Sequence, residues 1–319
     1  MKFELVIDSK KSEVIIALLK EGRLIELHKE QRNNDYCVGD IYLGKVRKIV
    51  PGLNASFINV GYEKDGFLHY LDLGSQINSF KKFTEKTLTK KLNTASLKNF
   101  KKEKDTNKEG DIKNILKGGD QILVQVTKEP ISSKGPRLST ELSIAGRYMV
   151  LLPFSERVSI SQKIKSRSER SRLKNLIQSI KPEGFGVIIR TVAEKKKVAD
   201  LDKDLKNLYK KWQSIYKKTK ISKPKTRVHN ELRRTSAIIR DLLTSEFNKI
   251  HVNDADMYNE IKEYLARISP NQEKIVKLYK SEIPIFQKME VTQQIKSSFG
   301  KTANMKNGTY LVIEHTEAL

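Results

Sequence analysis

Cysteine and long apolar runs are nearly absent from this sequence of 319 residues, and both absences exclude classes of protein. The single cysteine, Cys37, rules out an internal disulfide framework and a cysteine-based zinc site within the chain. No run approaches the roughly 18 apolar residues that a membrane span needs. The N-terminal segment is too short and too interrupted by charge for a signal peptide. We therefore expect a soluble, cytoplasmic protein with no membrane partner.

Acidic residues are scarce relative to basic ones. The chain has 38 acidic and 62 basic side chains, a formal net charge of +24 and a pI of about 9.8. Like charges repel one another in a compact chain unless a polyanion neutralises them, so nucleic acid becomes the default partner. A lysine-rich proteome, which raises the lysine content of every protein, is the alternative explanation. The size of the excess favours a nucleic-acid partner.

Aromatic residues make up only 7% of the chain, yet five of them lie within residues 39–70. These five are Tyr42, Phe57, Tyr62, Phe67 and Tyr70. Cations alternate with them, namely Lys45, Arg47, Lys48 and Lys64. Three β-rich runs, separated by turn signals at 51–52 and 64–66, cover Ile41–Ile49, Ala55–Val60 and Gly66–His69. Rings stack on bases and cations neutralise phosphates, so the pattern is typical of a single-strand-binding barrel. A half-buried meander with core aromatics stays open as the alternative.

Other segments give a mixed α and β pattern around this run. Strands are predicted at Lys2–Ile7, Glu13–Leu19, Arg23–His28, within 118–127, and at Tyr148–Pro153, Gly186–Arg190, Lys249–Val252 and Glu273–Tyr279. Helices are predicted at Ser168–Ile180, Val198–Lys218, Glu231–Leu243, Ala255–Ser269 and Thr292–Phe299, followed by a hairpin that turns at 306–308. The alternation of helix and strand after residue 128 is an α/β signature.

Lysine dominates the segment after the aromatic run. Residues 81–108 contain ten lysines against Glu85, Glu103 and Asp105, a net charge of +7, and show no clear apolar period. Such a segment is not expected to bury enough apolar surface to order itself. We therefore expect a disordered, lysine-rich insertion over residues 76–110. Contact with RNA phosphates is the alternative, and a solvated loop is favoured over it.

Taken in order, these segments resemble the ribonuclease E/G family of bacterial endoribonucleases over nearly the whole chain, the lysine-rich insertion excepted. The most specific pieces are 41–45 (Ile-Tyr-Leu-Gly-Lys), 55–61 (Ala-Ser-Phe-Ile-Asn-Val-Gly), 66–68 (Gly-Phe-Leu), 134–140 (Lys-Gly-Pro-Arg-Leu-Ser-Thr), 184–191 (Gly-Phe-Gly-Val-Ile-Ile-Arg-Thr), 277–279, 283–286 and 308–319. One such piece alone is a weak signal. Their shared order and spacing makes coincidence improbable.

The resemblance implies a multi-domain fold of mixed α+β and α/β type. Its parts are an RNase H-like subdomain (1–36 and 223–285), an S1 barrel of OB-fold type (37–127), a 5′-sensor (128–222) and the start of a DNase I-like catalytic subdomain (286–319). In the family the barrel grips single-stranded RNA, and the matching positions imply RNA contacts by Phe57, Phe67 and Lys134. To these we add the cations Lys45 and Lys128 as candidate RNA-binding residues.

The resemblance also implies that the 5′-sensor binds an RNA 5′-monophosphate. The matching groups are the side chains of Arg190 and Thr191 and the backbone amides of Gly146 and Val150. A guanidinium supplies a planar fork of donors for phosphate oxygens, and a threonine adds a hydroxyl. Without the family context, Arg190 and Thr191 would be interpreted as a routine surface pair at the end of a strand.

Catalysis in the family uses Mg²⁺. The cation is held by the aspartate of a motif of the type Ile-Asp-Val-Asn-Ser, which follows the segment matching 316–319, together with a second aspartate further along. Such a cation lowers the pKa of bound water and neutralises developing charge. The chain stops before that motif and lacks the Cys-Pro-x-Cys zinc link through which the family pairs its subunits, while Glu314 and Glu317 have no second acidic partner. We therefore expect no catalytic or metal-binding residue here, no Mg²⁺ held by this chain, and no homo-oligomer through that link.

One preferred function and two alternatives follow as expectations. The preferred one is the N-terminal portion of a ribonuclease E/G-type endoribonuclease of rRNA processing and mRNA decay. It would bind single-stranded RNA, sense a 5′-monophosphate and be inactive alone. The alternatives are a non-catalytic S1-type RNA-binding protein and a ribosome-associated S1 protein with no link to processing.

Overall fold

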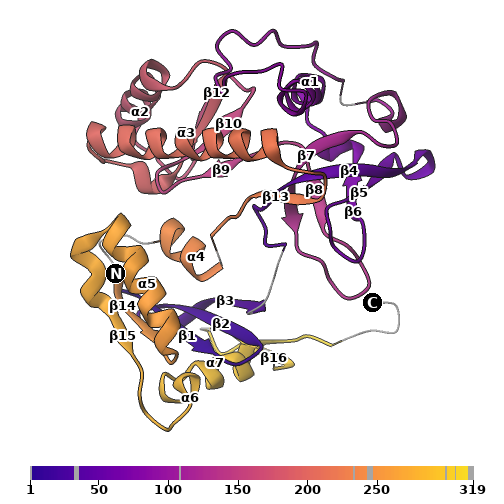
Figure 1. Cartoon of the computed structure of the whole chain (residues 1–319). Coiled ribbons are helices and arrows are strands. Elements are labelled where there is room, and N and C mark those ends of the chain that lie inside the picture. The colour runs from indigo at the N-terminus through magenta and orange to yellow at the C-terminus, as the bar shows by residue number, and fades with distance from the viewer. Residues whose placement is uncertain are drawn as a thin grey trace. The chain divides into compact units, whose positions relative to one another are not determined.

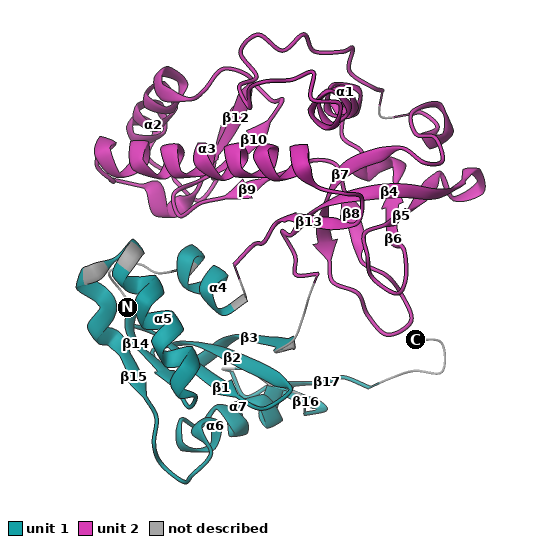
Figure 2. Cartoon of the chain, in the orientation of Figure 1, with its two compact units in different colours: residues 1–34, 234–319 teal, residues 35–233 magenta. Residues whose placement is uncertain are grey.

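The computed structural model describes residues 2–31, 36–107, 109–232, 234–242, 247–298, 300–305 and 307–314. The chain forms two compact units, of which the first combines residues 1–34 with 234–319 and the second covers 35–233 (Figure 2). The second unit therefore interrupts the first in sequence. Within the described residues, no helix is both long enough and apolar enough to cross a lipid bilayer.

The first unit contains a five-stranded mixed sheet. Its strands, in spatial order, are β15 (Val276–Leu278), β14 (Phe247–Val252), β1 (Phe3–Ser9), β2 (Glu13–Lys20) and β3 (Arg23–Gln31). The last three form the predicted antiparallel meander, whereas β1–β14 and β14–β15 are parallel pairs. The helices are α4 (Arg234–Leu242) and α5 (Ala255–Ile268). The strand predicted at 273–279 shrinks to three residues because Pro270 begins a 3-10 helix that runs to Ile275.

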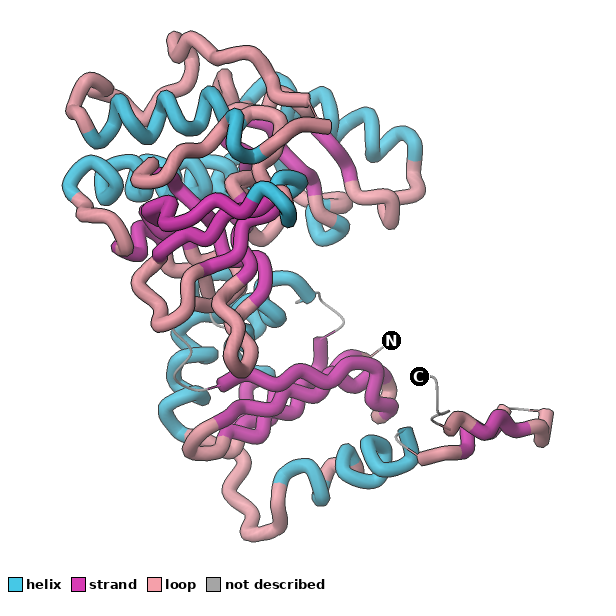
Figure 3. The backbone as a smooth tube through the Cα atoms, turned by 90° about the vertical axis from the view of Figure 1, so that its right-hand side faces the viewer, coloured by secondary structure: helices cyan, strands magenta, loops and turns pink. Residues whose placement is uncertain are grey.

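Two short helices and a hairpin complete this unit. They are α6 (Ile285–Lys288), α7 (Val291–Ser298), β16 (Thr302–Asn304) and β17 (Tyr310–Val312). Ile285, Phe286 and Val291 are buried against residues of β1 and β2, so the helices cover part of the sheet. The hairpin follows α7 as two short paired strands (Figure 3). Its strands agree with the prediction, although residue 306 of the predicted turn lies outside the described residues.

A closed five-stranded barrel begins the second unit, and it confirms the expectation of an OB-like fold. The strands are β4 (Ile41–Val50), β5 (Ala55–Asn59), β6 (Gly66–His69), β7 (Gln121–Lys128) and β8 (Arg137–Ser139). Their order is β4-β5-β6-β8-β7, and β7 pairs with β4 to close the barrel. Only the β6–β8 pair is parallel. An additional strand, β13 (Thr226–His229), pairs with the first residues of β4, Ile41–Leu43 (Figure 1).

The lysine-rich insertion is ordered over its described residues, so the prediction of disorder for 76–110 is wrong. Residues 77–88 form helix α1 (Ile77–Leu88), which packs against β7. Ile77, Phe80 and Phe83, spaced three apart, give the helix a buried face, and Leu97 is buried further along. The overall lysine content of the segment concealed this apolar spacing, because the lysines at positions 81, 82 and 86 lie among the apolar positions of the helix.

The rest of the second unit is an α/β layer, as predicted. Its sheet has the order β11 (Val158–Ile160), β12 (Phe185–Ile189), β10 (Met149–Pro153) and β9 (Ile144–Ala145), with helices α2 (Arg167–Ile180) and α3 (Val198–Ile221). Helix α3 crosses one face of the sheet (Figure 1). Leu201, Leu205, Leu208, Trp212 and Ile215 are its buried residues at helical spacing. They join one core with α1 and the sheet.

His229 on β13 makes the stability of this unit dependent on pH. Burial lowers the pKa of His229 to about 4, although Glu231, 4.0 Å away, opposes the effect. The unfolded chain takes up a proton near pH 6.5, so stability is complete above that pH and is lost as the pH falls towards 4. The loss is on the order of 3 kcal/mol.

We expect the free energy of unfolding of His229→Gln, measured by urea denaturation, to depend less on pH between 6.5 and 4 than that of the wild type. If the dependence of the unfolding free energy on pH were the same in the variant as in the wild type, His229 would not have this role. Burial also lowers the pKa of His251, but this residue lies in the other unit and is unchanged in the variant, so it does not affect the comparison.

Candidate nucleic-acid interface

One row of side chains runs across the barrel from strand to strand. Lys48 is paired with Phe57, Phe57 with Phe67, Phe67 with Arg137, and Arg137 with Lys128. Residues paired at one register position project on the same face of a sheet. The three cations are exposed and the two rings are partly exposed, so this is the outer face. The row therefore places two aromatic rings between cations.

The two predicted aromatic residues form one surface. The rings of Phe57 and Phe67 meet edge to face with centroids 5.8 Å apart. His69 extends the same strand, with its ring 6.4 Å from that of Phe67. Buried residues such as Ile58 and Leu68 alternate with them and fill the barrel instead. Partial exposure leaves ring faces available for stacking, whereas the alternative of a purely internal role would need full burial.

The remaining predicted cations lie near this row. Lys45 is exposed on β4, paired with Asn59, which is two residues from Phe57 and so shares its face. Lys134 is exposed in the β7–β8 loop, where it bridges to Ile131. The next residue, Gly135, has no room for a Cβ, which would lie 2.2 Å from the carbonyl oxygen of Asp65. The backbone of the β7–β8 loop therefore lies directly against the backbone of residues 64–65, in the turn that precedes β6.

Acidic residues restrain two arginines beside the row. Arg137 donates to Asp72 from two nitrogens, at 3.0 and 3.3 Å, and Arg47 lies 3.3 Å from Asp65. The lysines at positions 45, 48, 128 and 134 form no ion pair among the described residues. The sequence pattern placed Lys48 together with Phe57 and Phe67, and the family motif 134–140 contains Arg137, but neither predicted the strand pairing that connects them in one row. Strand register supplies that connection, and no local pattern in the sequence carries it.

The predicted 5′-sensor residues meet at one edge of the α/β sheet. Arg190 and Thr191 directly follow β12, Ser161 follows the parallel strand β11, and Tyr148 precedes the antiparallel strand β10. Backbone bonds tie these ends together: the Arg190 amide donates to the Tyr148 carbonyl and the Ser161 amide to that of Ile189, both at 2.9 Å. The strand order therefore brings segments about 30 to 40 residues apart onto one edge.

Side chains at this edge are held in place. The guanidinium of Arg190 donates to the Gly146 carbonyl at 3.0 Å, and the Thr191 and Ser161 hydroxyls are 3.0 Å apart. Arg170 donates to the carbonyls of Ser161 and Ile164, which fixes the turn after β11. A cation and two hydroxyls thus lie at the same partly exposed strand ends. This set suits an oxyanion with several acceptor oxygens.

Asp204 of α3 positions the turn before β10. Its carboxylate accepts bonds from the amides of Arg147, Tyr148 and Met149 at 2.9–3.2 Å. Burial raises the pKa of the Asp204 carboxyl, and the three amide bonds oppose that rise. A Cβ on Gly146 would lie 2.7 Å from this carboxylate, so glycine is required for the approach. Sequence reasoning missed Asp204, because nothing in a helical segment signals a partner 55 residues earlier.

Two of the predicted phosphate-binding groups are less available than expected. The Gly146 amide already donates to the Met149 carbonyl at 2.9 Å. Val150 lies within β10, paired with Ala145 on one side and Ile188 on the other. Phosphate contact by the Gly146 amide would need this turn to open, whereas Arg190 and Thr191 would contact phosphate through their side chains. The structure thus places the four predicted groups at one edge of the sheet. The two side chains are partly or fully exposed, whereas the backbone of Gly146 and Val150 is already paired.

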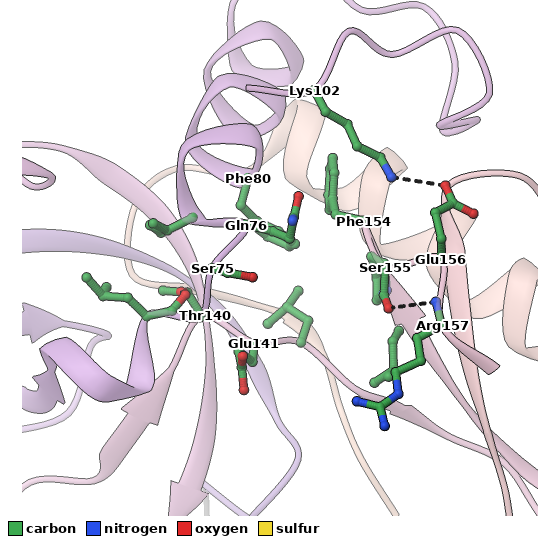
Figure 4. A pocket seen from close by; sticks show the side chains of 16 residues that line it. Ser75, Gln76, Phe80, Lys102, Thr140, Glu141, Phe154, Ser155, Glu156 and Arg157 are labelled. Atoms are coloured by element: carbon green, nitrogen blue, oxygen red, sulfur yellow. Dashed lines mark hydrogen bonds and ion pairs between the residues drawn. The ribbon is translucent and has the colours of Figure 1, made fainter. Parts of the chain in front are cut away.

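A pocket of about 520 Å³ lies elsewhere in the second unit (Figure 4). Phe80 and Phe154 contribute to its apolar wall, and an ion pair of 3.0 Å joins Lys102 to Glu156 at its rim. Its lining balances Lys102 and Arg157 against Glu141 and Glu156. None of the predicted RNA-binding residues lines it. Because its two cations are matched by two carboxylates, the pocket has no excess positive charge to attract a phosphate group. Within the described ranges, no group of three or more His, Cys, Asp or Glu residues is arranged to hold a metal ion.

Comparison with known proteins agrees with this geometry. Residues 143–319 match the family model described as the ribonuclease E/G family. The chain is 32% identical to ribonuclease G of Haemophilus influenzae over 316 residues, which cover 99% of this chain and 60% of that protein. It is 30% identical to ribonuclease G of Escherichia coli K12 over 319 residues, 100% of this chain and 61% of that one. Ribonuclease E of Nostoc sp. is 31% identical over 309 residues, with coverage of 96% and 41%.

The chain thus spans about three fifths of the length of the ribonuclease G proteins that it matches. The family model covers more than half of this chain, and the relatives match it along nearly its whole length. The resemblance seen in the sequence motifs is therefore confirmed. The chain belongs to the ribonuclease E/G family.

Proposed function

We propose that this chain is the RNA-binding part of a ribonuclease E/G-type endoribonuclease and holds single-stranded RNA across its barrel. The observation that carries this proposal is the row Lys48–Phe57–Phe67–Arg137–Lys128, which places two rings suited to base stacking between cations suited to phosphate. Stacking on rings tolerates any base, and the cations follow the backbone. The names of the relatives and the net charge of +24 support RNA as the polyanion.

The second part of the proposal is recognition of an RNA 5′-monophosphate at the edge formed by Arg190 and Thr191. The guanidinium of Arg190 and the paired hydroxyls of Thr191 and Ser161 support it, because they offer donors to several oxygens of one phosphate. A 5′-hydroxyl presents no charged acceptor to this set. The site is therefore expected to distinguish the two kinds of RNA end.

The activity proposed for the whole protein is endonucleolytic cleavage of RNA in its processing and decay. In the family this reaction uses Mg²⁺, which binds and activates water. The described residues do not fit this cation, because no suitable group of ligands occurs among them. We therefore assign them no step of the reaction and limit their role to binding and orienting RNA.

Finer features of the fold belong to the same proposal. The meander β1–β3 joined to two parallel strands supports the RNase H-like interpretation of 1–36 and 223–285. The interpretations of 37–127 as an S1 domain, of 128–222 as the 5′-sensor and of 286–319 as the start of a DNase I-like subdomain remain predictions. So does preferential binding of 5′-monophosphorylated RNA.

Replacing Arg190 with alanine tests the 5′ site. We expect affinity for a 5′-monophosphorylated oligonucleotide to fall by about 10- to 100-fold, because charge-assisted bonds worth roughly 1.5–3 kcal/mol are removed. Affinity for the same oligonucleotide with a 5′-hydroxyl should not change. Fluorescence anisotropy with both RNAs measures the ratio.

Arg157→Ala is the matched control, since Arg157 is an exposed arginine that immediately precedes β11, whereas Arg190 follows the parallel strand β12, at the opposite strand ends. This variant should keep the wild-type preference for the monophosphate. Equal affinity of the wild-type chain for the two ends would refute the 5′ site without affecting the barrel proposal.

A further inference from the structure

Three lysines gather at the C-terminal end of α1. Lys86 lies in the last turn, and Lys90 and Lys91 follow the helix; all three are exposed. In the part of the chain that the structure describes, none of them forms an ion pair. The nearby carboxylate of Glu103 is paired with Lys82 instead. Lys82 is the main cause of the lowered pKa of that carboxyl, and Lys86 is close enough to contribute to it without a direct ion pair among the described residues. This end of α1 therefore carries an excess of positive charge.

The chain holds these lysines on a fixed frame. Phe83 packs its ring 5.2 Å from that of Trp212 and anchors α1 to α3. The Leu92 amide donates to the Lys86 carbonyl at 3.1 Å, and Lys90 takes a left-handed φ of +57°, so the chain turns sharply back. Tyr216 then donates its hydroxyl to the Leu92 carbonyl. Each lysine backbone is thus connected to the core within a few residues.

Helix α3 adds two more lysines beside this turn. The ammonium of Lys220 lies 6.0 Å from the centre of the Tyr216 ring, the same ring whose hydroxyl binds residue 92. Lys217, three residues earlier on the same side of the helix, is exposed. We call the set formed by Lys86, Lys90, Lys91, Lys217 and Lys220 the basic cluster. Glu85 is the exposed acidic residue on the adjoining turn of α1.

The basic cluster offers charge without a stacking surface. The aromatic residues beneath it, Phe83, Trp212 and Tyr216, are buried. Single strands are bound by rings together with cations, whereas a duplex keeps its bases stacked and presents closely spaced phosphates from two strands. A rigid array of lysines with no exposed ring matches the second kind of ligand. It shares no residue with the barrel row.

We propose that the basic cluster is a second RNA-binding site, which binds the phosphate backbone of double-stranded RNA. The inference rests on the proposed function only for the choice of RNA as the polyanion. A chain with both sites binds a stem through α1 and α3 while an unpaired segment lies on the barrel. In this proposal the lysines of α1 and the following turn bind double-stranded RNA, and the barrel row binds the single strand.

The test compares a blunt RNA hairpin with an unstructured oligonucleotide of equal length, each measured over a range of salt concentrations. For K86Q/K90Q/K91Q we expect hairpin affinity at low salt to fall at least about tenfold. The log–log salt slope should decrease by about 0.9 for each phosphate that the variant no longer neutralises, or about 2.7. For K217Q/K220Q, on the other helix, the slope should decrease by about 1.8. Affinity for the unstructured strand should remain within about twofold, because its site shares no lysine with the cluster.

The control variant K274Q/K280Q/K288Q removes the same charge from exposed lysines of the other unit. An equal decrease in slope for control and cluster variants would overturn the proposal, since only net charge would then matter. Equal losses for hairpin and single strand would also overturn it. Binding to phosphatidylglycerol vesicles that disappears in K86Q/K90Q/K91Q, with hairpin binding unchanged, would assign the cluster to a membrane surface instead. If F57A/F67A loses affinity for the single strand but keeps affinity for the hairpin, the basic cluster binds RNA independently of the barrel row.

Discussion

Replacing both Phe57 and Phe67 with alanine is expected to weaken binding of single-stranded RNA by about 2–4 kcal/mol, or roughly 30- to 1,000-fold. Each ring supplies a stacking surface worth about 1–3 kcal/mol per base. The rings are neighbours across β5 and β6 with centroids 5.8 Å apart, so one strand of RNA can use both. Titration of a labelled, unstructured oligonucleotide at fixed salt measures the loss.

The conservative pair F57Y/F67Y separates stacking from packing. Tyrosine keeps the ring, so this variant should retain affinity within a few-fold while the alanine pair loses it. Chemical denaturation of both variants provides the second measurement. If the alanine pair lost most of the protein's stability, the two residues would be part of the core and the barrel row would not be the RNA surface.

Replacing Phe83 with alanine should reduce the free energy of unfolding by about 3–5 kcal/mol, because it removes a fully buried ring from a close-packed core. Phe83 contacts the rings of Phe154, Trp212 and Tyr216, so the cavity would lie where α1, α3 and β10 meet. The same change should expose the lysine-rich segment to trypsin. Denaturant unfolding and limited proteolysis measure the two effects.

Phe100 is the matched control, since its ring lies 5.8 Å from that of Phe83 but is only partly buried. We expect Phe100→Ala to cost clearly less than Phe83→Ala, in proportion to its smaller buried surface. Rapid cleavage of wild-type protein within residues 81–107, at the rate of an unfolded chain, would show that the segment is disordered after all.

The barrel is the part of the fold that the sequence predicted best. Turn signals at 51–52 and 64–66 bound the runs that become β4, β5 and β6, and the last of these has the predicted limits. Alternation within the strands also separates the outward Phe57 and Phe67 from the inward Ile58 and Leu68. Local signals suffice here because consecutive strands pair with their neighbours.

Features that depend on distant contacts were predicted less well. Composition suggested disorder for 76–110, yet Phe83 packs against Trp212 of α3, more than 100 residues away, and Phe80 packs against Phe154. The support that Asp204 gives to the turn at 147–149 also depends on tertiary structure. Residues Arg190 and Thr191 came from the family motif, and the sheet order explains why Ser161 joins them. Propensity and spacing do not report such contacts.

The interruption of one unit by the other has a consequence for synthesis on the ribosome. Strand β1 emerges first and pairs with β2, but its other neighbour, β14, follows about 240 residues later, as the bond from Ser9 to Asn253 shows. At about 5–20 residues per second, one edge of the nascent meander stays open for roughly 12–50 s. The 35–233 unit is completed within that interval and can fold before β14 arrives. The open edge of β1 is then a site for chaperone capture or mispairing, because an unpaired strand edge is a template for another chain.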